Sequence, residues 1–252
     1  MEGRSLVWFV SDVHLGLHTA DPAEREARFI AFLKRIPRDS QALYLLGDIW
    51  DFWYEYRDVV PREGARVVAE LLALMDAGVQ VFFFPGNHDM WCFSHFESLG
   101  MKRCEQPQLV EIGGKTFCLG HGDGLGGGNF SYRFLHFLFA NRFIQWCFSL
   151  LHPWLAFRLG TGWSGNKRAA HDGYHFRGES ESLYRFALEQ SSHVHVDYFI
   201  FGHFHDAVDM TLPGGARLIV LKDWIGGGEP YALFDAVNAS FSVSLPASSP
   251  RN

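Results

Sequence analysis

Short apolar runs alternate with longer segments of helical periodicity along most of the chain, a pattern typical of an α/β protein. Most of these runs are continuous rather than alternating with polar residues, which predicts strands buried on both faces. The expected strands are Leu6–Val10, Ala42–Leu46, Val79–Phe84, Leu109–Ile112, Thr116–Leu119, Tyr198–Phe201, Asp206–Leu212, Arg217–Leu221, Tyr231–Asp235 and Phe241–Leu245. Helical spacing of apolar residues predicts helices over Pro22–Ile36, Glu63–Ala77 and Glu179–Ser191.

The segment Asn129–Gly160 breaks this alternation because it is dense in aromatic residues. It predicts two helices, with Pro153 at the start of the second or at a kink. They are either buried in a larger core, or they form a cap whose inner face holds an acyl chain or whose outer face touches a membrane. We favour the cap, because an apolar patch with a cationic rim suits an amphiphile. We therefore expect a single domain, residues 1–252, with a helical cap insertion near residues 129–170.

Charge is distributed unevenly along the 252 residues. The formal net charge of −6 disfavours nonspecific binding of nucleic acid, which requires a basic face. Residues 124–171 contain no Asp or Glu and five Arg or Lys, so the remainder of the chain carries −11. The candidate cap is thus basic, and its surroundings are acidic.

The four cysteines, Cys92, Cys104, Cys118 and Cys147, have neither CxxC spacing nor an evident pairing, which indicates a reducing compartment. The N-terminus leads directly into the first strand and then Asp12. Cleavage of a signal peptide would remove Asp12, a candidate metal ligand, so we expect none and predict a cytoplasmic protein. No apolar run approaches the ~20 residues that a membrane-spanning helix needs.

Five short polar motifs follow apolar strands, at the position where open α/β sheets bind their ligands. They are Asp12-Val13-His14, Gly47-Asp48-Ile49-Trp50-Asp51, Gly86-Asn87-His88-Asp89, His121-Gly122-Asp123 and Gly202-His203-Phe204-His205. Carboxylates, imidazoles and an amide without a thiolate suit Mn²⁺, Fe or Zn²⁺. The motifs therefore predict a metal centre.

Together, these motifs resemble those of the calcineurin-like metallophosphoesterase family, from Val7 to Trp224. The resemblance implies a sandwich of two mixed β-sheets flanked by helices, and two divalent ions, for which we expect Mn²⁺. It assigns one ion to Asp12, His14, Asp48 and His205, and the other to Asp48, Asn87, His121 and His203. Two dications about 3.5–4 Å apart repel each other, so the shared Asp48 carboxylate lies between them, and they lower the pKa of a water that attacks phosphorus.

The cap position narrows the resemblance to the UDP-2,3-diacylglucosamine pyrophosphatases of lipid A synthesis. Local strings also look like theirs, namely His152–Leu155, Ser164–Arg168 and Leu221–Trp224. The resemblance implies hydrolysis of the pyrophosphate to UMP and 2,3-diacylglucosamine 1-phosphate, with the cap resting peripherally on the inner face of the inner membrane. Expected substrate-binding residues are Arg142, Asn166, Lys167 and Arg168.

His88 departs from the best-known branch of that group, which has Arg at this position. Paired with Asp51, His88 would form a dyad able to protonate a leaving oxygen. Alternatively, Asp51 caps the following turn and His88 only donates a hydrogen bond to the α-phosphate. We favour the dyad as the catalytic pair, because an Asp three residues after the bridging Asp48 is the spacing of related protein phosphatases.

Two other functional classes stay open. The same centre would serve a nucleotide phosphodiesterase or a phosphatase that acts on a soluble phosphoester, although neither substrate explains an apolar cap. A non-catalytic scaffold is the third class, which the complete set of ligand positions disfavours.

Overall fold

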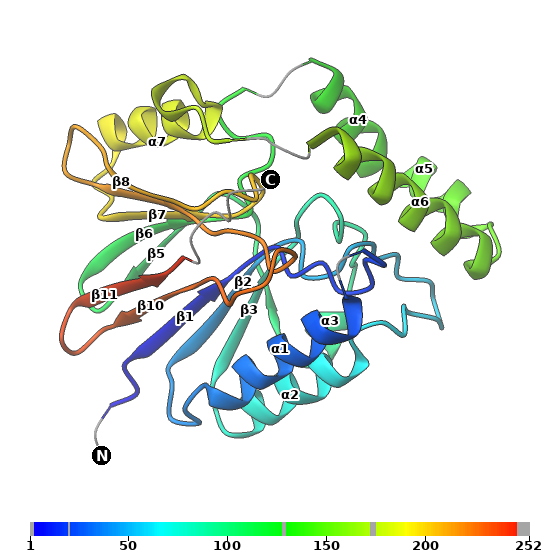
Figure 1. Ribbon diagram of the computed structural model, residues 1–252, viewed down its shortest axis with the longest axis horizontal. Coiled ribbons are helices and arrows are strands. Elements are labelled where there is room, and N and C mark those ends of the chain that lie inside the picture. Colours follow the sequence, from blue (N-terminus) through cyan, green and yellow to red (C-terminus); the bar gives the residue numbers. More distant parts are fainter. Residues whose placement is uncertain (1–2, 20, 128–129, 172–174, 246–252) are drawn as a thin grey trace.

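Two β-sheets face each other, and helices cover their outer faces, in the computed structural model (Figure 1). The structure describes residues 3–19, 21–127, 130–171 and 175–245, without the side chains of 130–133 and 163–171. This arrangement confirms the expected sandwich of two mixed sheets.

The first sheet has six strands in the order β11-β10-β1-β2-β3-β4. Its strands are β1 (Leu6–Val10), β2 (Ala42–Leu46), β3 (Gln80–Phe84), β4 (Lys102–Arg103), β10 (Tyr231–Asp235) and β11 (Ser240–Ser244). β1, β2, β3 and β4 are parallel, whereas β10 is antiparallel to both β1 and β11. All five residues of β2 are buried, as its continuous apolar run predicted.

The second sheet has five strands in the order β5-β6-β7-β9-β8. Its strands are β5 (Gln108–Ile112), β6 (Lys115–Leu119), β7 (Tyr198–Phe201), β8 (Val208–Thr211) and β9 (Arg217–Val220). The β5–β6 and β8–β9 pairs are antiparallel hairpins, and β6, β7 and β9 are parallel.

The helices divide between the two outer faces and the cap (Figure 1). α1 (Pro22–Arg35), α2 (Ala65–Asp76) and the short α3 (His95–Ser98) lie on the side of the first sheet, and α7 (Ser182–His193) covers the second. The remaining helices are α4 (Phe130–Ala140), α5 (Arg142–Ser149) and α6 (Pro153–His171), with the 3-10 turn Gly178–Ser180 before α7.

Three apolar layers hold this arrangement together. One lies between α1, α2 and the first sheet, one between the two sheets, and one between the second sheet and α7. In the middle layer, the rings of Phe9 from β1 and Phe117 from β6 stack with centroids 5.7 Å apart. Burying a phenylalanine side chain stabilises a fold by about 1.5–3 kcal/mol, so such contacts fix the spacing of the sheets.

The cap differs from its prediction, because it contains three helices instead of two. Asn141 separates α4 from α5, since its side-chain oxygen accepts hydrogen bonds from the backbone N–H groups of Phe143 and Ile144 and so caps a new helix. Pro153 begins α6, as one of the two alternatives predicted.

Several element boundaries also differ. α2 begins at Ala65 rather than Glu63, because Gly64 has a left-handed φ of 76°. α7 begins at Ser182 because the residues before it form a 3-10 turn. The short elements β4 and α3 were not predicted, since neither is long enough to show periodicity.

Two further expectations concern covalent and membrane features. All four cysteines are free, as predicted. Among the helices in the described part of the chain, none has the length and apolarity needed to cross a bilayer.

Candidate metal centre

The five motifs come together at one edge of the sandwich, because each follows the carboxyl end of a strand. β1, β2 and β3 lead to Asp12, Asp48 and Asn87, while β6 and β7 lead to His121 and His203. Backbone hydrogen bonds join the loops: the N–H of His14 donates to the carbonyl of Asp48 over 3.0 Å. The sequence therefore predicted which residues meet, since parallel strands end at a common edge.

The backbone of the candidate ligands is unusual. Seven non-glycine residues in the described part of the chain have a positive φ, and five of them belong to the predicted ligand set. These are Asp12 (52°), His14 (53°), Asp48 (52°), His203 (71°) and His205 (55°). A left-handed conformation costs free energy in residues with a Cβ, and such costs concentrate at functional sites. The loops are thus shaped by the position that these side chains must take.

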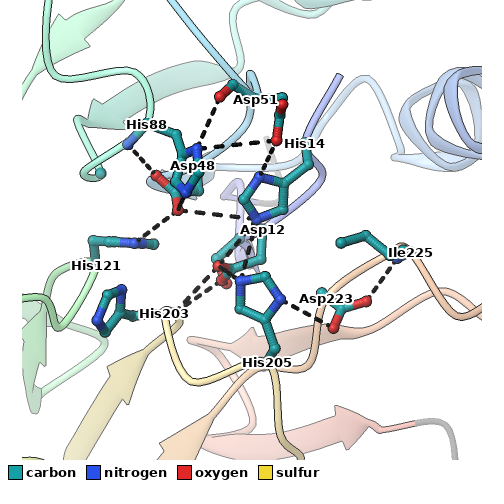
Figure 2. Close-up of polar contacts among 12 residues, drawn as sticks. Asp12, His14, Asp48, Asp51, His88, His121, His203, His205, Asp223 and Ile225 are labelled. Atoms are coloured by element: carbon teal, nitrogen blue, oxygen red, sulfur yellow. Dashed lines mark hydrogen bonds and ion pairs between the residues drawn. The ribbon is translucent and has the colours of Figure 1, made fainter. Parts of the chain in front are cut away.

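The first predicted ligand group is assembled as expected. Asp12, His14, Asp48 and His205 each offer a donor atom within 4.8 Å of the others. The Nε2 atoms of His14 and His205 lie 3.3 Å apart, and Nε2 of His205 lies 3.3 Å from Oδ1 of Asp12. Figure 2 shows these side chains converging from separate loops. Four buried or half-buried donors facing one point fit a divalent ion.

The second predicted group shares Asp48. Its Oδ2 lies 3.2 Å from Nε2 of His121, and the rings of His121 and His203 are adjacent, with centroids 5.1 Å apart. Asn87 contributes a buried Oδ1 that has no hydrogen-bond partner among the described residues. A buried amide oxygen without a partner is costly, and a cation would satisfy it. The residues present therefore fit a second ion beside the first.

Three imidazoles have an oxygen atom close to Nδ1. Nδ1 of His14 lies 3.3 Å from Oδ1 of Asp51, and Nδ1 of His205 lies 3.3 Å from Oδ2 of Asp223. Nδ1 of His121 is 3.0 Å from the backbone carbonyl of Leu46. The carbonyl behind His121 can hold the ring proton on Nδ1 and leave Nε2 for an ion. The carboxylates beside His14 and His205 lie at ion-pair distance, and Nδ1 of His14 has no hydrogen-bond partner among the described residues.

The predicted Asp51–His88 pair is adjacent, but its contact is mainly through the backbone. Nδ1 of His88 is 2.8 Å from the carbonyl oxygen of Asp51 and 3.9 Å from its carboxylate. Nε2 of His88 points toward Asp48, at 3.9 Å from Oδ2. His88 is partly exposed, with 17% of its side chain accessible. Its catalytic role, and that of Asp51, stays a prediction.

Two motif glycines allow the ligand loops to approach each other. A Cβ at Gly86 would lie 2.3 Å from Oδ1 of Asp48, and one at Gly202 would lie 2.1 Å from Oδ2 of Asp12. Both distances are far shorter than a van der Waals contact. Only glycine therefore fits at these positions without displacing the carboxylate of Asp48 or of Asp12.

The charged groups of the centre shift one another's pKa values. Burial alone would raise the pKa of Asp12 and of Asp48, but the facing histidines hold both pKa values below their ordinary range. Burial lowers the pKa of His205, yet its contacts with Asp12 and Asp223 outweigh this effect and raise that pKa to about 9. In the metal-free protein, a proton on His205 therefore competes with an ion for Nε2.

Two carboxylates of the centre had no role in the sequence prediction. Asp89 is buried and accepts hydrogen bonds from the backbone N–H groups of Gly86, Ile49 and Trp50, which anchors the Asp48 loop. Burial and the neighbouring Asp48 raise the pKa of Asp89 to about 7. Asp223 faces His205 as described above. The available signal for Asp223 was its position just after β9, since the other ligands also follow strands.

The cap packs on the loops that carry the centre. The hydroxyl of Tyr54 donates to the carbonyl of Gln145 over 2.6 Å, and Nε1 of Trp91 donates to the carbonyl of Phe139 over 2.8 Å. Large apolar side chains on the cap are nevertheless exposed, which disagrees with the buried-core alternative. They are Phe134, Phe137, Phe143, Trp146, Leu150, Trp154, Leu155 and Leu159.

The predicted substrate-binding residues all belong to the cap helices α5 and α6. Arg142 is exposed at the first position of α5. Asn166, Lys167 and Arg168 belong to α6, but their side chains lie outside the described part of the structure. All four stay predictions.

Comparisons of the sequence with known proteins identify a family and several relatives. The family model described as calcineurin-like phosphoesterase matches residues 5–207. A protein from Porphyromonas gingivalis named UDP-2,3-diacylglucosamine hydrolase is 39% identical over 249 residues, covering 92% of this chain and 95% of its own. Proteins of the same name from Histophilus somni and Aeromonas salmonicida are 28% and 29% identical, covering 86% and 87% of this chain and 91% and 86% of theirs.

Proposed function

This chain belongs to the calcineurin-like phosphoesterase family, and we propose that it hydrolyses the pyrophosphate of UDP-2,3-diacylglucosamine. Its Porphyromonas gingivalis relative is named a hydrolase of that compound. The products are UMP and 2,3-diacylglucosamine 1-phosphate, which places the reaction in lipid A synthesis. The observation that carries this proposal is the match along nearly the whole length of both chains, combined with the assembled cluster of Asp and His residues.

Two divalent ions, proposed to be Mn²⁺, complete the centre. Asp12, His14, Asp48 and His205 would hold one, and Asp48, Asn87, His121 and His203 the other. When bound, the ions supply Lewis acidity toward the phosphoryl oxygens and lower the pKa of the attacking water. The donor set supports hard or borderline ions, since it contains carboxylates, imidazoles and an amide oxygen but no thiolate.

His88 is the proposed proton donor to the leaving group. Water attacks the α-phosphorus, the bond to the bridging oxygen of the pyrophosphate breaks, and that oxygen leaves with the sugar phosphate. Nδ1 of His88 is held by the carbonyl of Asp51, so Nε2 faces the centre and can donate a proton or a hydrogen bond to this oxygen. The proposed role of Asp51 is to orient this ring together with that of His14.

The cap would bind the acyl chains and contact the membrane. We regard residues 129–170 as an insertion in a single domain. Its exposed aromatic side chains and lack of acidic residues support a peripheral contact with an anionic bilayer, proposed to be the inner face of the inner membrane. The guanidinium of Arg158 lies 5.5 Å from the ring centre of Trp154, so charge and apolar surface are interleaved on α6.

The substrate assay compares three compounds with the manganese-loaded protein: UDP-2,3-diacylglucosamine, its deacylated analogue, and a soluble nucleotide or cyclic dinucleotide. Each buried methylene contributes roughly 0.8 kcal/mol, so a few methylenes held by the cap raise kcat/KM by tens to hundreds of fold. Equal efficiency on the acylated and deacylated compounds would reject the lipid substrate and support the soluble-phosphoester alternative. Arg142→Glu should weaken use of the anionic lipid while sparing a small chromogenic phosphodiester.

A further inference from the structure

The loop after β9 brings a buried carboxylate, Asp223, to the back of the centre. The N–H of Trp224 donates to the carbonyl of Asp12 over 3.0 Å, and Nη2 of Arg28 donates to the carbonyl of Trp224 over 2.8 Å. Asp223 itself is 4% exposed. The loop is therefore held from two sides, by the ligand loop after β1 and by helix α1.

The two carboxylate oxygens of Asp223 have different partners. Oδ1 accepts the backbone N–H of Ile225 over 2.7 Å, which fixes the plane of the carboxylate. Oδ2 lies 3.3 Å from Nδ1 of His205 (Figure 2). Because the loop amide orients the group through one oxygen, the other oxygen is presented to the histidine in a fixed direction.

His205 uses its second nitrogen on the opposite side of the ring. Its Nε2 lies 3.3 Å from Oδ1 of Asp12 and 3.3 Å from Nε2 of His14, inside the first ligand group. An imidazole that binds an ion through Nε2 carries its proton on Nδ1, and that proton requires an acceptor. In the described structure, the carboxylate of Asp223 lies where this acceptor is needed.

We propose that Asp223 is the positioning residue of His205: it selects the tautomer with the proton on Nδ1 and aims Nε2 into the first ligand group. This inference rests on the metal centre of the proposed function and adds a residue to it. His121 provides a contrast, because its Nδ1 faces the uncharged carbonyl of Leu46. Loss of the Asp223 charge should therefore weaken one ion site more than the other.

The test is Asp223→Asn, an isosteric change that can keep the hydrogen bond from Ile225 but removes the negative charge facing His205. The matched control is Asp235→Asn, because Oδ1 of Asp235 likewise accepts the N–H of the residue two positions later, Val237, over 3.0 Å. Titration calorimetry of each metal-free protein with Mn²⁺ should show a 10–100-fold weaker affinity for one of two ions in Asp223→Asn, the usual effect of removing such a carboxylate. Asp235→Asn should bind both ions as the wild type does.

A second measurement is made on the wild-type protein, and it uses a variant only to assign one resonance. In the zinc-loaded wild-type protein, nitrogen-15 spectra of the histidine rings should show His205 with its proton on Nδ1, protected from solvent exchange. The resonance is assigned by its absence in His205→Ala. A proton on Nε2 of His205, unchanged Mn²⁺ affinity in Asp223→Asn, or a wild type that binds no ion would each overturn the proposal.

Neither measurement uses a substrate, so the two proposals fail separately. Normal ion binding and the expected tautomer without hydrolysis of the nucleotide lipid would reject the proposed substrate and leave Asp223 in its role. Hydrolysis of that substrate by the wild type, together with unchanged Mn²⁺ affinity in Asp223→Asn, would support the proposed substrate and reject the role of Asp223.

Discussion

The carboxylate of Asp51 lies closer to His14 than to His88. Its Oδ1 is 3.3 Å from Nδ1 of His14 and 3.9 Å from Nδ1 of His88. The carboxylate is thus nearer to His14, which belongs to the first ligand group. The candidate proton donor His88 instead contacts the backbone carbonyl of Asp51, at 2.8 Å. The carboxylate of Asp51 therefore lies beside one ring, while its backbone carbonyl contacts another.

This division of contacts predicts the effect of Asp51→Asn. We expect Mn²⁺ affinity to fall by about 10–100-fold, because His14 loses the negative charge that lies 3.3 Å from its Nδ1. Calorimetry with the metal-free protein measures this directly. A variant that binds both ions normally and loses only turnover would instead support the carboxylate dyad with His88.

Replacement of the shared ligand should be more severe. Asp48→Ala removes the carboxylate that lies 3.2 Å from His121 and belongs to the first ligand group as well, so we expect loss of bound metal and of nearly all hydrolysis. His205→Ala should likewise lose an ion. Elemental analysis gives the metal content, and circular dichroism should show a folded chain. Two ions per chain in Asp48→Ala would contradict the assignment.

His88→Ala tests the proposed proton donor. Since His88 is predicted to act on the leaving oxygen and not as a ligand, both ions should stay bound while turnover falls by about 10²–10⁴-fold. Metal content and kcat are measured on the same preparation. Loss of an ion would make His88 a ligand, and unchanged kcat would remove it from catalysis.

The exposed aromatic residues of α5 give a prediction for membrane contact. Replacing Phe143 and Trp146 together by Ser should release the protein from anionic phospholipid vesicles in a flotation assay, since each inserted side chain contributes about 1.5–3 kcal/mol. Val237→Ser is the matched control, because Val237 is 73% exposed but lies outside the cap. Equal vesicle binding by all three proteins would contradict a membrane role for the cap.

The raised pKa of His205 predicts how ion binding depends on pH. In the metal-free protein this pKa is about 9, so the neutral ring that an ion requires becomes more populated as pH rises toward that value. We expect the affinity for Mn²⁺ to increase from pH 7 to pH 9, with proton release visible as a buffer-dependent binding enthalpy. An affinity that is flat across this window would show that His205 is already neutral at pH 7.

The raised pKa of His205 has the opposite effect on the stability of the metal-free protein, because this contribution decreases as pH rises. A histidine whose folded pKa exceeds its unfolded value of about 6.5 stabilises the fold fully below that value. The contribution is lost as pH rises through the folded pKa of about 9. Urea unfolding of the metal-free protein at pH 6 and pH 9 should therefore show the difference, and Asp223→Asn should reduce it.

The sequence alone determined the sheets and the residues that meet at their edge. Apolar runs such as Ala42–Leu46 predicted buried strands, and a polar residue just after a parallel strand has only one edge of the sheet to occupy. The local sequence pattern was therefore enough to predict that Asp12, Asp48 and His203 lie close together. For Pro153 the sequence left two alternatives, the start of a helix or a kink, and the structure has it at the start of α6, where a proline has no N–H to lose.

Only the tertiary structure decided which side chains pair. That Asp51 faces His14, and that Asp223 faces His205 from a loop eighteen residues farther along the chain, depends on distances between loops that no periodicity encodes. The break between α4 and α5 at Asn141 likewise depends on its side-chain oxygen, which accepts a hydrogen bond from the backbone N–H of Phe143 in the next turn. Secondary structure follows from local sequence, whereas the direction of a side chain depends on the packing and hydrogen bonds supplied by the rest of the fold.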